Sequence, residues 1–349
     1  MAKSLYIYKN GNILYFKDLG LYLNKNLIVD FSQYVGSFKV FLSKFRVFNR
    51  LFRLDPRLAI VENDICLLSF LRRIFVISIN DKKILSEIPV RRGFSNILNI
   101  CSVSQNNEAV FYWGDYGQND KKEEIFIYRY TIQSGLEECY KFPKNTIKHI
   151  HNILYDIYRN QFVVFTGDLD EDVGIYIANK DFTEVTPFLV GDESYRAVVG
   201  YVLPEGLIWA TDSVLKENYL YYYSFENNEL KILATLGGSV IYGTKVNNGL
   251  AFATTVEPYP SKKSKILSLL DNRRAPSVKT NNVDLYFLSK KLILSKLASY
   301  SKDFLPMRLF QYGHISFPIY EDENDKTLYY NPVGVRKLDG TIVEKRLKA

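Results

Sequence analysis

Apolar and polar positions alternate along most of this chain, and the alternation is grouped into units that recur every 40 to 50 residues. In each unit an apolar strand is followed 15 to 17 residues later by a second strand with an acidic end. Four such pairs begin near Ile97, His149, Tyr195 and Val240 and end at Asp115, Asp168, Asp212 and Glu257. Four short strands per unit at this period are typical of a β-propeller, whose blades surround a central axis.

The unit boundaries predict the number of blades. Units at residues 58–95, 96–143, 147–190, 195–235, 238–300 and 305–346 give six blades, with five or seven as alternatives. Turn residues such as Asn247-Asn248-Gly249 separate the strands within a unit. The sequence therefore predicts an all-β fold in which residues 1–349 form one propeller of four-stranded antiparallel blades.

The N-terminal region does not follow this repeat clearly. Residues 4–17 have the pattern of a β-hairpin with a turn at Asn10-Gly11-Asn12. An open ring would leave strand edges unpaired, so we expect this hairpin to close the ring against the last blade. Residues 18–57 are mixed in character and predict one short helix around residues 41–52.

Composition supports strands and indicates an anionic partner. The 349 residues are 47% hydrophobic and include 27 Tyr and 23 Phe, residue types that favour strands. The formal net charge of +7 predicts attraction to polyanions such as acidic glycans, nucleic acid or anionic lipid. Solubility alone explains the charge equally well. The basic residues follow strand alternation and form no RNA-binding motif, so we expect no nucleic-acid partner.

The cysteines and the apolar stretches indicate in which cellular compartment the protein is expected. Cys66, Cys101 and Cys139 are odd in number and widely spaced, which predicts free thiols in a reducing compartment. Charges interrupt the first nine residues before a secretory apolar region can form, and four charges interrupt residues 58–79. We therefore expect a cytoplasmic protein with no membrane span. The sequence does not indicate an oligomeric state.

The chain has three histidines. His149 and His151 are two residues apart, which places both imidazoles on one face of a strand. His314 follows Gln311 in the sequence Gln311-x-x-His314. Imidazoles with a carboxamide or carboxylate suit a divalent metal or an acid–base pair near neutral pH. His149, His151 and His314 are therefore candidate metal ligands, with structural, hydrogen-bonded histidines as the alternative.

The acidic strand ends form a second candidate set. Asp115, Asp168, Asp212 and Glu257 would meet at one rim of a ring, where carboxylates can act on a glycosidic bond or bind sugar hydroxyls. The alternative is that each accepts backbone hydrogen bonds in its own tight turn.

Arginine and tyrosine side chains complete the candidate site. Arg196 and Arg308 are suited to bidentate binding of a substrate carboxylate. Candidate stacking faces for sugar rings are those of Tyr116, Tyr195, Tyr242 and Tyr312.

One segment is unusually basic. Residues 261–302 contain ten Lys or Arg and two acids, Asp271 and Asp284, which predicts a solvated loop or an anion-binding lip. Phosphate-binding glycine loops, dinucleotide fingerprints, Cys-x-x-Cys pairs and Gly-x-Ser-x-Gly elbows are all missing from the sequence. Their absence argues against nucleotide-dependent enzymes, zinc ribbons and serine hydrolases.

Parts of the sequence resemble a known family. Residues 149–158, followed by Phe165-Thr166-Gly167-Asp168, and the strand ends at Asp212 and Glu257 resemble bacterial sialidase-like propellers of the BNR-repeat type. That resemblance implies a six-bladed ring with a glycan site on one face. His149-x-His151 and Gln311-x-x-His314 also offer ligands similar to those of propeller polysaccharide lyases with a histidine-rich manganese site.

These observations lead to one functional hypothesis and one alternative. The hypothesis is a carbohydrate-active propeller that binds, and as a glycosidase or lyase cleaves, an acidic glycan in bacterial surface-polysaccharide metabolism. The catalytic candidates are His151, Asp168 and Glu257. The substrate-binding candidates are Arg196, Asp212, Asp115, Tyr195, Gln311 and Arg308. The alternative is a non-catalytic propeller that serves as a scaffold for a glycan or a protein.

Overall fold

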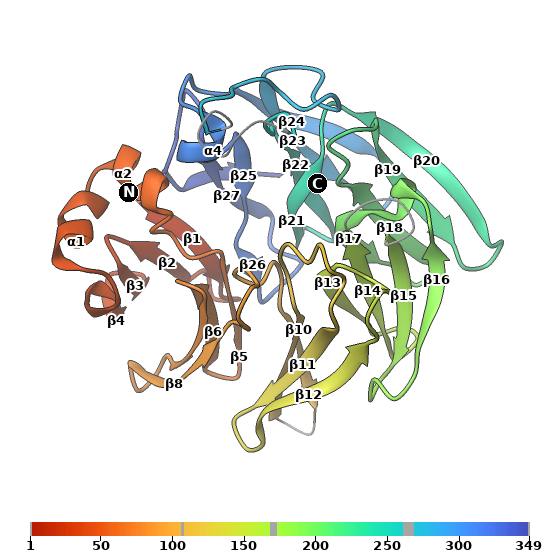
Figure 1. Cartoon of the computed structure of the whole chain (residues 1–349), viewed down its shortest axis with the longest axis horizontal. Helices are drawn as coiled ribbons and strands as arrows, with labels where there is room; N and C mark the ends of the chain where they lie inside the picture. Colours follow the sequence, from red (N-terminus) through yellow and green to blue (C-terminus); the bar gives the residue numbers. More distant parts are fainter. Residues whose placement is uncertain (1, 106–107, 168–172, 261–268, 348–349) are drawn as a thin grey trace.

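Seven antiparallel sheets surround a central axis in the computed structural model, which describes residues 2–105, 108–167, 173–260 and 269–347 (Figure 1). The predicted all-β propeller of antiparallel blades is confirmed. The favoured count of six blades is wrong, because the ring has seven. The six predicted units all correspond to blades, and the blade that the repeat did not reveal lies at the N-terminus.

Blades two to six each consist of four consecutive strands. Blade two contains β5 (Leu58–Glu62), β6 (Ile65–Phe70), β7 (Arg73–Ser78) and β8 (Lys83–Pro89). Blade three contains β9 (Cys101–Gln105), β10 (Glu108–Gly114), β11 (Ile125–Thr131) and β12 (Gly135–Phe142). Blade four contains β13 (His149–Asp156), β14 (Gln161–Gly167), β15 (Gly174–Asn179) and β16 (Val185–Val190).

The next two blades repeat this order. Blade five contains β17 (Ala197–Val202), β18 (Gly206–Thr211), β19 (Asn218–Ser224) and β20 (Glu229–Leu236). Blade six contains β21 (Val240–Val246), β22 (Gly249–Thr254), β23 (Asn282–Leu288) and β24 (Leu294–Ser301). The first strand of each blade is innermost. Because every blade repeats the same up-and-down order, the innermost strands begin at one common end of the axis, which we call the upper end.

Blade one is the blade that sequence reasoning missed. It contains β1 (Ala2–Ile7), β2 (Ile13–Lys17), β3 (Gly20–Leu23) and β4 (Asn26–Asp30). The turn between β2 and β3 is made by Asp18 and Leu19, both with positive φ (48° and 65°). Such a turn normally carries Asn-Gly or Asp-Gly. With leucine at its second position and strands of only four or five residues, this half of the blade lacks the usual pattern.

The two ends of the chain meet between blades one and seven. Blade seven contains β25 (His314–Ser316), β27 (Thr327–Val333) and β28 (Val343–Arg346). The short strand β26 (Ile319–Tyr320) leaves this blade and pairs in parallel with β1. Asn331 of β27, which is 1% exposed, accepts hydrogen bonds from the backbone N–H of Ser4 (2.8 Å) and from its hydroxyl (3.0 Å). Its amide donates to the Ser4 carbonyl (3.1 Å), so one side chain joins the two blades.

Replacing Asn331 with alanine is expected to destabilise the fold by about 2 kcal/mol, because it leaves the buried N–H and C=O of Ser4 without partners. The free energy of unfolding from a denaturant titration measures the effect. Asn227→Ala, in an exposed turn of blade five, is the matched control. An Asn331→Ala protein as stable as that control would show that the contact between Ser4 and Asn331 does not hold the ring closed.

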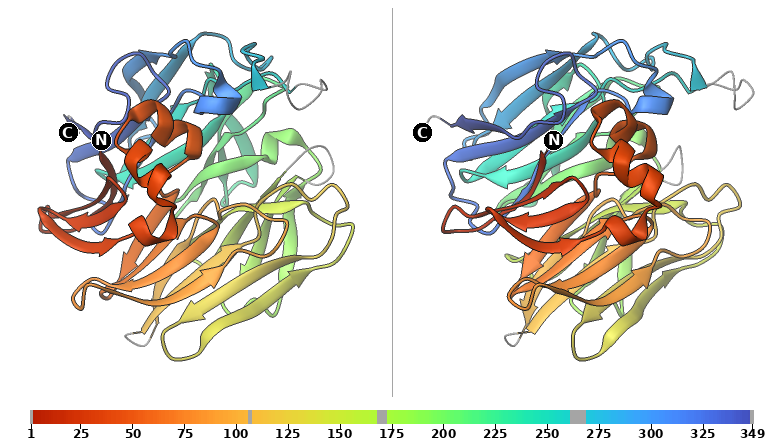
Figure 2. Two further views of the ribbon diagram at one scale, coloured as in Figure 1. Left: turned by 60° about the vertical axis from the view of Figure 1, so that its left-hand side comes forward. Right: turned by 90° about the vertical axis from the view of Figure 1, so that its left-hand side faces the viewer.

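Helices are few and lie at the connections between blades. The helix expected at residues 41–52 is a pair, α1 (Ser37–Ser43) and α2 (Arg46–Phe52), because Phe45 adopts an extended conformation between them. The chain also forms η1 (Ser32–Tyr34), η3 (Glu193–Tyr195) and α4 (Met307–Phe310). None of the described helices is long and apolar enough to cross a membrane. In the right-hand view of Figure 2, the helix pair and α4 lie on the same side of the ring.

Candidate functional site

Side chains from six blades converge near the axis at its upper end. They come from the residues just before the innermost strands, from the start of those strands, and from the loops after the second strands. We call this group the axial cluster, and it consists of Arg57, Tyr116, His149, His151, Arg196, Asp212, Tyr242, Glu257 and Tyr312.

The histidines of the cluster form a directly bonded pair. Nδ1 of His149 lies 2.8 Å from the Gly117 carbonyl and Nδ1 of His151 lies 3.0 Å from the Ala197 carbonyl. A carbonyl oxygen only accepts, so each Nδ1 carries a proton in this arrangement. The two Nε2 atoms are 2.9 Å apart. A hydrogen bond between them requires one more proton, so the pair is built to accept a proton.

Burial opposes that proton. Both rings are more than nine-tenths buried, and burial is the main cause that lowers the pKa of His151 well below its ordinary value. The neighbouring His149 ring and the Arg196 and Arg57 guanidinium groups lower it further. His151 therefore stays neutral near pH 7 unless an anion enters the cluster and offsets these charges.

Blades five and six contribute two buried carboxylates. Asp212 follows β18 and lies 3.6 Å from the guanidinium of Arg196, the residue before β17. Glu257 follows β22 and accepts a hydrogen bond of 2.6 Å from the Ser239 hydroxyl. Burial raises the pKa of Glu257, while the Ser239 hydrogen bond and the charge of Arg196 oppose the rise. Arg196 is thus the cation shared by both carboxylates.

Tyrosine rings and a second arginine line the inner side of the cluster. The Arg57 guanidinium lies over the Tyr116 ring, 5.2 Å from its centre, and Tyr116 packs against His149 at 5.0 Å. Burial raises the pKa of the Tyr116 phenol, and the charges of Asp212 and Glu257 add to that rise while Arg57 opposes it. Burial also raises the pKa of the Tyr312 phenol, and Glu257 and Tyr116 add to that rise while Arg57 opposes it. These mutual influences show that the six blades form one electrostatic unit.

The cluster borders a cavity in the central channel. The cavity has a volume of about 430 Å³, and Arg57 and Tyr242 line it together with apolar side chains of the innermost strands, among them Ile60, Leu154 and Val198. Polar groups, including Asn99, Asn152, Lys245 and Glu323, line it as well. A mostly apolar cavity of this size with a few converging polar groups is typical of a small-molecule site.

Several predicted residues lie together in the axial cluster. His149, His151, Arg196, Asp212 and Glu257 are all members, as are three of the four predicted stacking tyrosines. Asp168 lies outside the described residues.

Other predicted residues lie outside the axial cluster and make local contacts. Asp115 turns toward its own blade, where it accepts from the Phe126 N–H (3.1 Å) and pairs with Arg91 (3.2 Å). Tyr195 packs in the apolar core between blades four and five. Arg308 donates to the Tyr259 carbonyl (2.6 Å), and the Gln311 carbonyl accepts from Arg50 (3.3 Å).

The three histidines do not meet as a metal site. His314 stacks on Tyr242 with ring centres 4.8 Å apart, and its Nδ1 bonds to the Tyr312 carbonyl. No contact joins it to the pair of His149 and His151 in the described structure. Within the described ranges, no group of three His, Cys, Asp or Glu side chains is arranged to hold a metal ion.

Sequence reasoning missed Arg57 and Ser239. Arg57 stands directly before β5, Arg196 directly before β17 and Ser239 directly before β21. The three positions are equivalent in their blades. Alignment of the units on the first residue of the innermost strand would therefore have identified Arg57 as the counterpart of Arg196.

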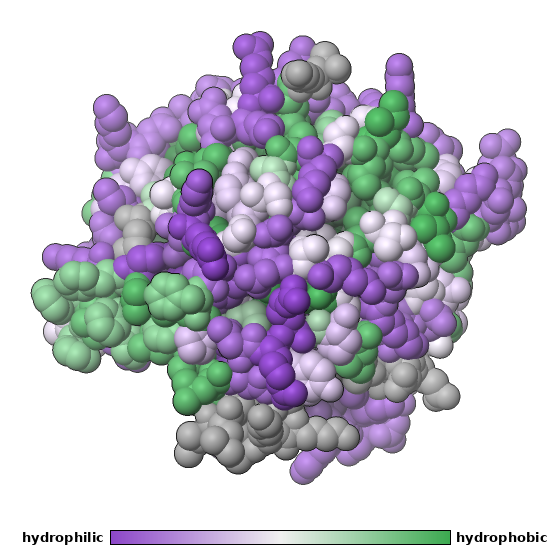
Figure 3. All heavy atoms as spheres, turned by 90° about the horizontal axis from the view of Figure 1, so that it is seen from above, coloured by the Kyte–Doolittle hydropathy of each residue, from purple (hydrophilic) through white to green (hydrophobic). Residues whose placement is uncertain are grey.

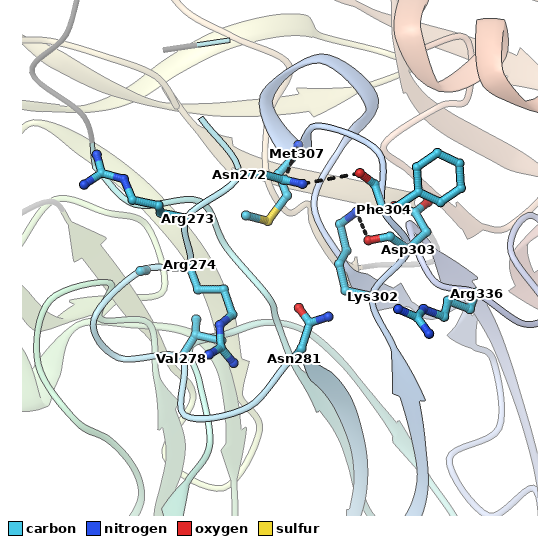
Figure 4. A pocket seen from close by; sticks show the side chains of 11 residues that line it. Asn272, Arg273, Arg274, Val278, Asn281, Lys302, Asp303, Phe304, Met307 and Arg336 are labelled. Atoms are coloured by element: carbon cyan, nitrogen blue, oxygen red, sulfur yellow. Dashed lines mark hydrogen bonds and ion pairs between the residues drawn. The ribbon is translucent and has the colours of Figure 1, made fainter. Parts of the chain in front are cut away.

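A second hollow lies beside the axial cluster, between blades six and seven. It has a volume of about 640 Å³ and is lined by Arg273, Arg274, Lys302 and Arg336 with Asn272 and Asn281 (Figure 4). The Arg274 and Arg336 side chains approach from opposite sides of Asn281, and among the described residues neither forms an ion pair. Part of this pocket is formed by the basic segment at residues 261–302, for which the sequence predicts a solvated loop or an anion-binding lip, and Asp303 lines the pocket as well. Residues 261–268 of that segment lie outside the described residues.

Comparisons with known proteins give the fold and no family. No protein-family model and no curated protein sequence matches the chain. A solved structure of the mitotic checkpoint complex is similar over 99% of this chain and 87% of its own, with a TM-score of 0.56 and 8% identity. An oligogalacturonate lyase in complex with manganese is similar over 83% of this chain and 76% of its own, with a TM-score of 0.52 and 11% identity. At such identities the likeness shows the propeller fold alone.

Proposed function

We propose that this propeller binds an acidic carbohydrate, with a sugar ring in the channel cavity and its carboxylate held by Arg57 and Arg196. The observation that carries the proposal is the hydrogen bonding of Arg57 and its position beside the cavity. Its Nε is buried and has no hydrogen-bond partner among the described residues, and Arg57 is one of the residues that line the cavity. Buried donors in folded proteins are almost always paired, so an unpaired one beside a cavity calls for an acceptor from a ligand.

The surroundings of Arg57 match a sugar acid. A carboxylate would form charge-assisted hydrogen bonds with the guanidinium. The Tyr242 ring and the apolar wall suit the C–H faces of a sugar, and the amides of Asn99 and Asn152 suit its hydroxyls. The oligogalacturonate lyase that shares the fold acts on an acidic carbohydrate by its name, which agrees with this choice of ligand. Membership of the sialidase-like family stays a prediction.

Replacing Arg57 with methionine is expected to weaken the binding of oligogalacturonate at least tenfold, because the substitution removes one charge-assisted contact. Isothermal titration calorimetry with oligogalacturonate and with a neutral galactan oligosaccharide measures the effect. Arg129→Met is the matched control, since it changes the net charge equally on β11, away from the axis. Equal affinity of the wild type for both sugars, or unchanged binding by Arg57→Met, would contradict the proposal.

Cleavage of the bound glycan needs a proton acceptor beside the sugar ring. The pair of His149 and His151 can take that proton, and the carboxylate of the ligand would offset the added charge. His151→Asn separates an enzyme from a binding protein. Loss of turnover with retained affinity indicates catalysis by the pair, whereas binding without turnover in the wild type indicates the non-catalytic alternative.

A further inference from the structure

The helix pair α1–α2 exposes four phenylalanines and a valine, while Leu42 is buried and Val40 and Phe52 pack against the core of blades one and two. Phe38, Phe41, Phe45 and Phe48 are 71%, 59%, 50% and 37% exposed, and Val47 is 45% exposed. Ring contacts link three of them, with Phe41 and Phe45 at 5.7 Å and Phe45 and Phe48 at 6.3 Å between ring centres. We call these five residues the aromatic patch. The pair forms the left-hand edge of the molecule in Figure 1, and Figure 3 shows a continuous apolar group at that edge.

The inner face of α2 is polar, which inverts the usual arrangement of a surface helix. Asn49 and Arg50 are its buried residues. Arg46 pairs with Asp55 and Asp339, and Arg50 pairs with Asp303 and Asp339. A helix at the surface of a soluble protein normally turns its apolar stripe to the core and its charges to water. Here the charges hold the helix to the ring and the phenylalanines point away from it.

The ion pairs also show that the aromatic patch is held in place. Two of the three carboxylates that pair with α2 lie far away in sequence, Asp303 before blade seven and Asp339 between its strands β27 and β28. The Arg50 guanidinium also donates to the Phe310 carbonyl (2.6 Å). A loose helix pair could turn its phenylalanines inward, whereas this one is fixed at two arginines. An exposed apolar surface that the fold holds outward marks an interaction site.

The charged side chains of the helix pair itself are all positive. Residues 31–54 contain five basic residues and no acidic residue. Arg46 and Arg50 are paired internally, while Lys39, Lys44 and Arg53 are exposed beside the phenylalanines. Exposed aromatic rings flanked by lysine and arginine are the composition of segments that lie in the interface of an anionic bilayer.

We propose that the aromatic patch docks this protein on the surface of an anionic lipid membrane. The phenylalanine rings enter the boundary between headgroups and acyl chains, and Lys39, Lys44 and Arg53 face the lipid phosphates. The ring of blades stays in water, since no described helix crosses a bilayer. This inference is independent of the acidic-carbohydrate proposal, because it uses none of the axial residues.

Co-sedimentation with lipid vesicles tests the docking surface. The wild-type chain is expected to bind vesicles that contain phosphatidylglycerol and to bind pure phosphatidylcholine vesicles at least tenfold more weakly. Phe41→Ser with Phe45→Ser is expected to lose at least tenfold in partitioning to the phosphatidylglycerol vesicles. Ile232→Ser with Ile293→Ser, which removes two exposed apolar side chains of blades five and six, is the matched control and should bind as the wild type does.

A spectroscopic variant identifies the contact directly. Tryptophan in place of Phe45 should show a blue-shifted emission with phosphatidylglycerol vesicles, while binding is kept. No vesicle binding by the wild type, or equal binding by the Phe41→Ser, Phe45→Ser variant, would overturn the proposal. The proposal would also be overturned if the wild type were a dimer in solution and the Phe41→Ser, Phe45→Ser variant a monomer. The aromatic patch would then be covered by a second copy of the chain.

Discussion

Replacing Arg50 with methionine is expected to destabilise the protein by about 3–5 kcal/mol, the usual effect of removing one partner from a buried charge network. Arg50 is 2% exposed and its guanidinium is bonded to Asp303, to Asp339 (3.4 Å) and to the carbonyls of Phe310 (2.6 Å) and Gln311 (3.3 Å). These contacts join α2 to the segment that precedes blade seven and to the connection between β27 and β28 within it.

The size of this effect follows from charge balance. The network around Arg50 contains three cations and three carboxylates, namely Arg46, Arg50, Lys302, Asp55, Asp303 and Asp339. Lys302 is itself buried, and desolvation lowers its pKa. Without Arg50 the network keeps one uncompensated negative charge at a buried site. Methionine fills much of the volume of the arginine side chain, so the expected decrease in the free energy of unfolding is electrostatic and does not come from a cavity.

Denaturant titrations of three variants check this prediction. Arg53→Met removes an exposed arginine from the end of the same helix and should change the free energy of unfolding little. Arg50→Met with Asp303→Asn restores neutrality and should recover part of the loss. If Arg50→Met lies within 1 kcal/mol of the wild type, or if the double variant is no more stable than the single one, the charge-balance explanation is wrong.

The blades were predictable from sequence where most of their strands are long. The six units from residue 58 onward carry strands of mostly six to eight residues with clear alternation, and the structure places a blade at each. Blade one was not visible because its third and fourth strands have four and five residues and because Leu19 adopts a positive φ in the turn before them. Tertiary pairing with β26 and Asn331 supports a blade that local pattern alone does not specify.

The convergence of distant polar residues was predictable, but the direction of each side chain was not. The repeat indicates that His151, Arg196 and Glu257 reach one end of the ring, and the structure brings them together. Asp115 occupies the same place in its unit as Asp212, yet it turns to Arg91 of its own neighbourhood. A residue's position in the repeat gives the end of the blade, while its partners decide whether it faces the axis. The roles proposed for these residues stay predictions.

The aromatic patch shows a different limit of sequence reasoning. The spacing of Phe38, Phe41, Phe45 and Phe48 is helical, and helical apolar spacing normally predicts a buried face. Only the structure shows that Asp303 and Asp339 lie behind α2 and draw its arginines inward. Carboxylates some 250 and 290 residues away in sequence thus decide which face of the helix meets solvent.

Acid is expected to destabilise this protein between pH 6.5 and about 3, and His314 is expected to account for a large part of the loss. Burial is the main cause that lowers the pKa of His314 from 6.5 to about 3. In that pH range His314 is protonated in the unfolded chain and neutral in the folded chain. Stability is therefore complete above pH 6.5 and falls as the pH decreases, by about 1.4 kcal/mol per pH unit for one histidine.

At pH 4.5 the contribution of His314 amounts to about 2.7 kcal/mol. His151, whose pKa burial also lowers, acts in the same direction. Glu257 and Asp115 act in the opposite direction, because burial raises their pKa values and the folded chain then takes up protons first. Only a comparison of two variants over the same pH range isolates the histidine from these carboxylates.

His314→Asn provides that comparison. The asparagine amide can still donate to the Tyr312 carbonyl, as Nδ1 of His314 does at 3.0 Å, but it does not titrate. The variant should be less stable than the wild type near pH 7, because it loses the stacking on Tyr242. Its free energy of unfolding should decline less steeply below pH 6.5, so the difference between the two proteins shrinks or reverses toward pH 4.5. Parallel pH profiles would mean that His314 is protonated in the folded protein at an ordinary pKa, and that the packing of the Tyr242 and Tyr312 rings around it leaves room for solvent.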